Sequence, residues 1–113
     1  VPVILGGFNS KRYDSRIITF EHHRHHLKFP PNVFFVDFRE VFPKFINLTS
    51  KRKGLGEYHL LATGRGIISA HTAVADAKAI ASILDHIKDR KGLWEAIEDK
   101  MEASEAVVRR CFR

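Results

Sequence analysis

Two short apolar runs in the first third of the chain have the composition of buried β-strands. Val3–Leu5 is followed by two glycines, and Val33–Phe38 is rich in valine and phenylalanine. β-Branched and aromatic residues bounded by turn residues favour strands. The polar and basic stretch 9–13 interrupts the apolar pattern. The sequence therefore predicts two strands, with a loop after the first.

A helix is expected between the two strands. It begins near Asp14, because a negative charge is stabilised at the positive end of a helix dipole, and Pro30 and Pro31 end it. Two strands joined by one helix form a parallel crossover, which places the chain in the α/β class. The apolar residues of the expected helix are Ile17, Ile18, Phe20 and Leu27.

Two short helical segments are expected after the second strand. The spacing of Val41, Phe42, Phe45 and Ile46 is helical but is interrupted by Pro43. A basic loop, 50–53, follows it. The next segment, Leu55–Leu61, reads as a short helix that ends at Gly64 and Gly66.

Two longer helices are expected in the last third of the chain. The clearest begins near Thr72, and its apolar positions form one continuous stripe. The last helix runs from about Leu93 to Arg109, with acidic residues at its start and arginines at its end. The stripe of the first of these helices consists of Ala73, Ala77, Ile80, Leu84 and Ile87.

The composition of the 113 residues limits the class of protein. Hydrophobic residues make up 44% and charged residues 28%, which is typical of one folded domain. No apolar run approaches the roughly 20 residues of a membrane span, so we expect no membrane partner. The single cysteine, Cys111, cannot form an internal disulfide, which favours an intracellular site, in the nucleus or the cytoplasm. The net charge of +6 favours a polyanionic partner.

Three side chains have the chemistry that phosphodiester hydrolysis requires. His71 immediately precedes the clearest helix, Asp76 lies in its first turns, and Asp14 opens the helix after the first strand. Carboxylates are preferred ligands of Mg²⁺ and Mn²⁺, and a pair of such ions holds the attacking and leaving oxygens in two-metal hydrolysis. A histidine can serve as the general base near neutral pH.

Two segments around these residues resemble known exonuclease motifs. GGFNSKRYDSRII (6–18) resembles the second motif of the DEDDh family of 3′–5′ exonucleases, and AHTAVADAKAIASIL (70–84) resembles the third. The five-residue step from Asn9 to Asp14, with an aromatic residue before the aspartate, is closest to that of the three-prime repair exonucleases. The resemblance covers about residues 3–87, in the family order.

The resemblance implies a role for each matching residue. Asp76 would be a direct ligand of the metal pair, Mg²⁺ or Mn²⁺, and Asp14 would bind the second ion directly or through water. His71 would be the general base, and Asn9 would help to hold the substrate. The implied fold is ribonuclease H-like, a mixed sheet flanked by helices. The implied activity is removal of nucleotides from the 3′ end of single-stranded DNA or RNA.

Two departures from the family pattern are visible. The first motif, an Asp-x-Glu on the first strand, is absent, and acidic residues at comparable spacing occur only where the topology excludes that role. We therefore expect the chain to be the C-terminal part of one exonuclease-like domain, with the missing strands before residue 1 and with no activity by itself. Residues 1–90 would form the motif-bearing body and 91–113 a C-terminal helix. The second departure is Phe8, where many members have histidine.

A second function remains open on the sequence alone. The chain could be a degenerate, inactive module that binds nucleic acid or a protein partner, and a homodimer is also possible. Phe8, Tyr13, Lys11 and Arg12 are the expected substrate contacts nearest the site. The basic residues that either bind phosphates or serve solubility are Lys11, Arg12, Arg16, Lys51, Arg52, Lys53 and Arg65.

A cluster of histidines stands apart from the motifs. On a helix His22 and His26 would share one face and could bind Zn²⁺, although a polar outer face is the simpler interpretation. The cluster comprises His22, His23, His25 and His26. Most of the nine phenylalanines are expected in the core, among them Phe34, Phe35, Phe42 and Phe45.

Overall fold

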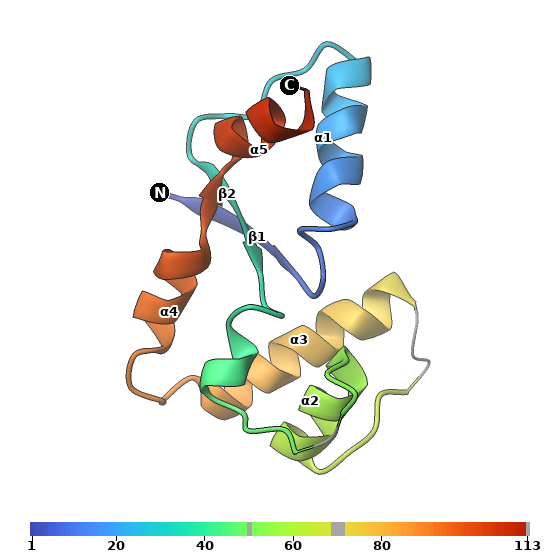
Figure 1. Cartoon of the computed structure of the whole chain (residues 1–113), viewed down its shortest axis with the longest axis vertical. Coiled ribbons are helices and arrows are strands. Elements are labelled where there is room, and N and C mark those ends of the chain that lie inside the picture. Colours follow the sequence, from blue (N-terminus) through green and yellow to red (C-terminus); the bar gives the residue numbers. More distant parts are fainter. Residues whose placement is uncertain (50, 69–71, 113) are drawn as a thin grey trace.

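A parallel pair of strands forms the centre of the molecule. A computed structural model describes residues 1–49, 51–68 and 72–112. Strand β1 (Val3–Gly7) pairs in parallel with β2 (Val33–Asp37), and helix α1 (Asp14–Arg24) makes the crossover between them (Figure 1). Both expected strands and the start of the helix at Asp14 are confirmed.

A third strand completes a mixed sheet. Strand β3 (Glu102–Ala103) pairs antiparallel with β2, so that Phe34 lies opposite Ala103 and the order is β1-β2-β3. The described residues therefore form an α/β fold with a three-stranded mixed sheet and five α-helices. The α/β class is confirmed.

The prediction of one C-terminal helix over residues 93–109 is wrong. Helix α4 (Leu93–Lys100) ends where Met101 adopts an extended conformation, and α5 (Ser104–Cys111) begins after β3. Each helix has an acid in its first turn and a base in its last, so the two charge patterns in series resemble one long helix. Backbone pairing of Glu102 and Ala103 with β2 separates them.

Helix α1 is shorter than expected and presents a different face to the sheet. It ends at Arg24, and His26 has a positive φ of 57°. Its buried residues are Ser15 and Thr19, whereas Ile17 and Phe20 are exposed. Hydroxyl groups can lie on this face because backbone carbonyls accept their hydrogen bonds: Thr19 Oγ1 donates to the oxygen of Ser15 at 2.6 Å.

The remaining helices pack below the sheet. After the 3₁₀ helix η1 (Phe42–Lys44), helix α2 (Leu55–Thr63) packs against α3 (Ala73–Ile87) (Figure 1). Gly64 ends α2 in the left-handed conformation and Thr72 caps α3, as the sequence predicts. The buried stripe of α3 differs from the predicted one, because Ala77 is exposed; it consists of Ala79, Ile83 and Ile87.

The hydrophobic core lies where the sheet end, η1 and the lower helices meet. Phe38 and Phe42 stack there with ring centroids 5.3 Å apart, next to Tyr58 and Ile83. Phe35 and Phe42 are buried as expected, whereas Phe34 and Phe45 are half-buried. The core thus supports the carboxyl ends of β1 and β2 from below.

Strand β1 approaches this core closely at Gly6, and a substitution there tests how close the contact is. A Cβ at Gly6 would lie 2.4 Å from Cε2 of Phe38, whose ring is buried and stacked on Phe42. We expect Gly6→Ala to lower the free energy of unfolding by about 1–3 kcal/mol, because the ring cannot move away freely. Urea denaturation measures this change.

The matched control is Gly56→Ala in α2. A Cβ at Gly56 meets no atom within 4 Å, so this substitution should leave stability unchanged or raise it by up to about 1 kcal/mol. Equal effects of the two substitutions would contradict the close contact at Gly6.

Candidate functional site

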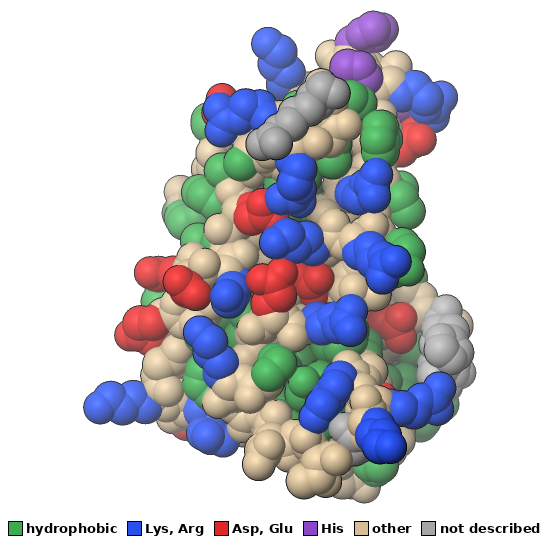
Figure 2. All heavy atoms as spheres, in the orientation of Figure 1, with side chains coloured by type: hydrophobic (Ala, Val, Ile, Leu, Met, Phe, Trp, Pro, Cys, Tyr) green, Lys and Arg blue, Asp and Glu red, His purple; other side chains and the backbone are tan. Residues whose placement is uncertain are grey.

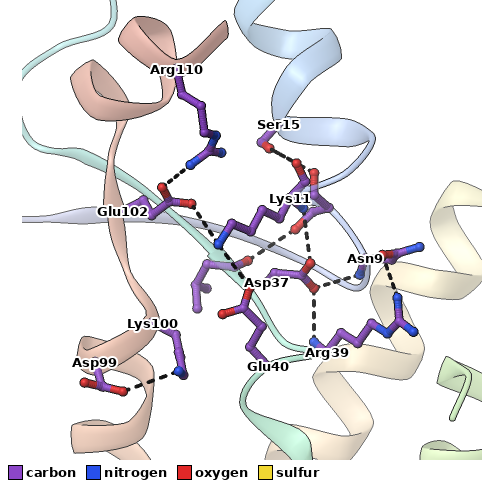
Figure 3. Close-up of polar contacts among 12 residues, drawn as sticks. Asn9, Lys11, Ser15, Asp37, Arg39, Glu40, Asp99, Lys100, Glu102 and Arg110 are labelled. Atoms are coloured by element: carbon purple, nitrogen blue, oxygen red, sulfur yellow. Dashed lines mark hydrogen bonds and ion pairs between the residues drawn. The ribbon is translucent and has the colours of Figure 1, made fainter.

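The carboxylate of Asp37, the last residue of β2, organises the loop that follows β1 (Figure 3). It is buried and accepts three backbone N–H groups: Oδ1 accepts from Asn9 at 2.7 Å and from Arg39 at 3.0 Å, and Oδ2 accepts from Lys11 at 3.2 Å. Hydrogen bonds to an ionised acceptor are stronger than neutral ones. A side chain, rather than strand pairing, therefore fixes this loop to β2.

Asn9 makes the sharp turn in this loop. Its φ of 61° lies in the left-handed region, which asparagine tolerates better than most residues. Its side chain is also held, because Nη1 of Arg39 donates to Oδ1 of Asn9 at 3.1 Å. The predicted substrate-holding residue thus has a defined orientation.

Two serine hydroxyls connect the loop to α1. Ser10 Oγ donates to the carbonyl of Val36 at 3.4 Å, and Ser15 Oγ donates to the carbonyl of Ser10 at 2.9 Å. Asp14 is the first residue of α1, and its Oδ2 would lie 3.6 Å from a Cβ added at Gly7. The carboxylate of Asp14 therefore lies close to the end of β1.

A groove of about 800 Å³ lies beside this loop and brings several predicted residues together. Phe8 and Asn9 line it from the end of β1, and Asp76 lines it from the first turn of α3. The other residues that line this groove are Arg39, Arg52, Lys53, Gly54, Leu55, Gly56, Glu57, Leu60, Gly66 and Ile67. We call it the sheet-end groove.

Phe8 forms the inner wall of the sheet-end groove. Its ring lies 6.3 Å from that of Phe42 and 5.9 Å from that of Tyr58, measured between centroids. Burial raises the pKa of the Tyr58 phenol, and the nearby charge of Arg39 lowers it by a smaller amount. Phe8 therefore anchors the loop on the core as well as facing the groove.

A second hollow, of about 390 Å³, lies on the other side of Asn9 and Arg39. Lys11 and Arg12 line it, but Nζ of Lys11 is paired with Glu40 at 3.5 Å and with Glu102 at 4.0 Å. Arg12 lies over the ring of Tyr13, 5.7 Å from its centroid. Arg12 and Tyr13 are exposed and can reach a ligand, whereas the Lys11 ammonium lies between the carboxylates of Glu40 and Glu102.

Of the two predicted metal ligands, Asp14 and Asp76, only Asp76 lines the sheet-end groove. His71 lies outside the described residues, and Asp14 does not line the sheet-end groove. Across residues 1–49, 51–68 and 72–112, no three histidine, cysteine, aspartate or glutamate side chains are placed to hold one ion. These residues therefore do not form a complete site for the expected ion pair.

Positive charge gathers around the sheet-end groove. Arg39, Arg52 and Lys53 line it. Lysine and arginine side chains are also spread over the face of the molecule seen in Figure 2. Two acids, Glu57 and Asp76, lie among them. The groove can therefore contact phosphates while keeping carboxylates near them.

Asp37 and Arg39 shape the candidate site, and the sequence reasoning did not single them out. The available signal was a carboxylate at the end of an otherwise apolar strand, Val33–Asp37, followed two residues later by an arginine. In parallel sheets the carboxyl ends of the strands commonly border the binding site.

The premise for zinc binding by the histidine cluster is wrong. Helix α1 ends at Arg24, so His22 and His26 do not lie on one helical face. The Nδ1 atom of His22 lies 3.0 Å from the carbonyl of Ile18, and its ring stacks on Phe29. Within the described part of the chain these histidines form no group of three metal ligands.

Comparison with known proteins identifies no family. The chain matches no protein-family model, and no curated protein matches it significantly. Among the described helices, none has the length and apolarity needed to cross a membrane. Any functional conclusion therefore depends on the residues and the geometry described above.

The role of Asp37 leads to a stability prediction. We expect Asp37→Asn to lower the free energy of unfolding by about 2–4 kcal/mol, because an amide accepts fewer of the three N–H groups and presents its own donors to them. Urea denaturation measures the loss, and amide hydrogen exchange should accelerate at Asn9 and Lys11.

Asp85→Asn is the matched control for this substitution. Asp85 is exposed, and among the described residues its carboxylate is paired with Lys88 alone, an i,i+3 ion pair that contributes less than about 1 kcal/mol. A similar stability for the two variants would show that Asp37 does not hold the loop.

Proposed function

We propose that this chain is the motif-bearing part of a metal-dependent 3′–5′ exonuclease with a ribonuclease H-like fold. The observation that carries the proposal is that Phe8, Asn9 and Asp76 line one groove at the carboxyl ends of β1 and β2. Phe8 and Asn9 come from one motif and Asp76 from the other, 67 positions after Asn9 in the chain. Ligands of α/β sheets bind at this edge.

The proposed roles follow from the chemistry of each side chain. Asp76 and Asp14 would be ligands of Mg²⁺ or Mn²⁺, which when bound would polarise the phosphodiester and activate water. His71 would accept a proton from the attacking water. Asn9, with its amide oxygen held by Arg39, would orient the 3′ end of the strand through its remaining NH₂ group.

The proposal requires acidic ligands beyond those in this sequence. The described residues form no three-ligand group, and the Asp-x-Glu of the family does not occur among the 113 residues. The proposed active protein therefore contains such a pair on a strand that joins this sheet. Tests of activity belong to that full-length protein.

A substitution of Asp76 tests the proposed reaction most directly. In the full-length protein, Asp76→Asn should reduce Mg²⁺-dependent release of nucleotides from a 3′-labelled single strand by about 100-fold or more, since even residues behind a metal ligand cost 10–100-fold. Asp85→Asn, on the exposed side of the same helix, should leave the rate unchanged.

Binding separates the loss of a metal ligand from the loss of the fold. Fluorescence anisotropy should show that Asp76→Asn still binds the same oligonucleotide in the absence of divalent ions, within about twofold of the unchanged protein. Undiminished nuclease activity in Asp76→Asn would disprove the assignment of Asp76 as a metal ligand.

A non-catalytic nucleic-acid-binding module is the second candidate. It is favoured by the fact that the described residues hold no complete metal site, whereas three basic side chains line the sheet-end groove. Such a module would bind single strands through their phosphates, and affinity would fall as salt rises. Absence of cleavage by the full-length protein, with binding retained, would favour this candidate.

Arg39 tests phosphate contact under either candidate. Arg39→Ala should reduce the slope of log affinity against log salt by about 0.7, the value for one phosphate contact on a single strand. The backbone N–H of residue 39 still donates to Asp37, so the loop keeps that bond. Lys78→Ala, on the exposed surface of α3, is the control. An unchanged slope for Arg39→Ala would exclude this contact.

A further inference from the structure

Helix α1 exposes apolar side chains on the side that faces away from the sheet. Tyr13 is 53% exposed, Ile17 60% and Phe20 43%, whereas Ser15 and Thr19 are buried. Successive residues of a helix are about 100° apart, so the three exposed residues, at spacings of four and three, form one stripe opposite the buried hydroxyls. We call it the outer stripe of α1.

The outer stripe lies at the edge of the molecule. Figure 1 shows α1 at this edge with α5 beside it, and hydrophobic side chains reach the surface along the same edge in Figure 2. Hydroxyl groups towards the sheet and apolar groups towards solvent are the reverse of the usual pattern of a surface helix. Single exposed apolar residues are common, but a row of adjacent ones indicates an interaction surface.

Phe20 is held in place on this surface. Its ring packs edge-on against that of Phe112, with centroids 5.0 Å apart, and the ring of Phe112 stacks on His23 at 4.1 Å. The residue at the end of α5 thus orders the Phe20 side chain and still leaves it exposed. A side chain that is already ordered loses less conformational entropy when a partner covers it.

The charges beside the outer stripe indicate which partner fits it. Arg16 lies on one side of the stripe and Glu21 on the other, five positions later. Both are exposed, and Arg16 makes no ion pair with another described residue. If a second copy of α1 packs in parallel, Arg16 lies beside the partner's Glu21, the pairing that flanks the contact of parallel coiled coils. The surface is therefore complementary to itself.

Antiparallel packing of the same stripes would bring like charges together. The two-fold axis of such a pair places each flanking residue beside its own copy, so that Arg16 would lie near the partner's Arg16 and Glu21 near the partner's Glu21. Such contacts disfavour the arrangement. Arg24 follows Phe20 on the stripe, but it is paired with Glu21 of its own helix at 2.7 Å. The charge pattern thus favours parallel helices.

We propose that the outer stripe of α1 is the contact surface of a homodimer in which two copies of α1 pack in parallel. Ile17 and Phe20 pack on the same residues of the second copy, and two ion pairs between Arg16 and Glu21 flank them. Helix α1 has 11 residues and is about 16 Å long, so the contact is small and the dimer is weak. None of these residues lines the sheet-end groove, so the dimer does not depend on the proposed function.

Sedimentation equilibrium of the whole chain tests the dimer. We expect a monomer at about 1 µM and a reversible dimer at about 100 µM and above, as for a small interface. Ile17→Glu should weaken dimerisation by at least about tenfold, because it places a charge where apolar side chains meet. Leu61→Glu, at a comparably exposed position of α2, is the matched control and should leave dimerisation unchanged.

Two outcomes of this experiment would overturn the proposal. A chain that remains monomeric up to about 1 mM would show that the stripe serves a different partner or none. A dimer that is unaffected by Ile17→Glu would show that the two copies meet elsewhere. Ile17 is exposed, so Ile17→Glu should fold, and urea denaturation verifies this.

Charge reversal tests the parallel arrangement. Arg16→Glu should weaken dimerisation by about tenfold, because it replaces two attractive pairs by two repulsive ones. Adding Glu21→Arg to Arg16→Glu exchanges the two charges and should restore the affinity to within about threefold. In an antiparallel dimer Arg16→Glu would only replace one like-charge pair by another. Unchanged affinity in Arg16→Glu would therefore refute the parallel arrangement.

Discussion

The hydrogen bonds from three backbone N–H groups to the carboxylate of Asp37 are the constraint on which the candidate site depends. A chain that leaves a parallel strand and returns as a helix must reverse direction within a few residues, and its N–H groups lose their strand partners there. Asn9 achieves the reversal in the left-handed conformation, and Asp37 accepts the N–H groups of Asn9 and Lys11. The start of α1, and with it Asp14, is fixed as a consequence.

Close approach around this carboxylate explains the residues next to it. Gly7 leaves room for Ser10, whose Cβ would lie 2.7 Å from a Cβ at position 7. Phe8 then enters the core beside Phe42 and Tyr58. Three contacts thus hold the loop. Its backbone N–H groups donate to Asp37, the ring of Phe8 packs in the core, and the Ser10 hydroxyl donates to the carbonyl of Val36. Such multiple attachment suits a site that must hold Asn9 in one orientation.

Elements specified by local chemistry could be predicted from the sequence. The strands Val3–Gly7 and Val33–Asp37 have the right residues and turn signals, and Thr72 and Gly64 are ordinary helix ends. Strand β3 could not be predicted, because two residues carry no periodicity and their pairing with Phe34 and Phe35 is long-range. The buried face of α1 was also hidden, since Ser15 and Thr19 bury hydroxyls that only the folded backbone satisfies. The candidate site divides in the same way: the sequence singled out Phe8, Asn9 and Asp76, which line one groove, whereas Asp37 and Arg39 act through contacts that only the fold creates.

The two acidic residues that line the sheet-end groove, Glu57 and Asp76, help to choose between a nuclease and a module that only binds nucleic acid. Glu57 has a local role, because its carboxylate folds back over Gly54 at the start of α2, where its Oε2 would lie 2.7 Å from an added Cβ. Thr72 already caps α3, so Asp76 adds at most a modest interaction with the helix dipole. In a groove that only binds phosphates, this carboxylate would repel the ligand. A divalent ion between the carboxylate and a phosphate converts that repulsion into attraction, which is why Asp76 supports the nuclease proposal more strongly than the binding module.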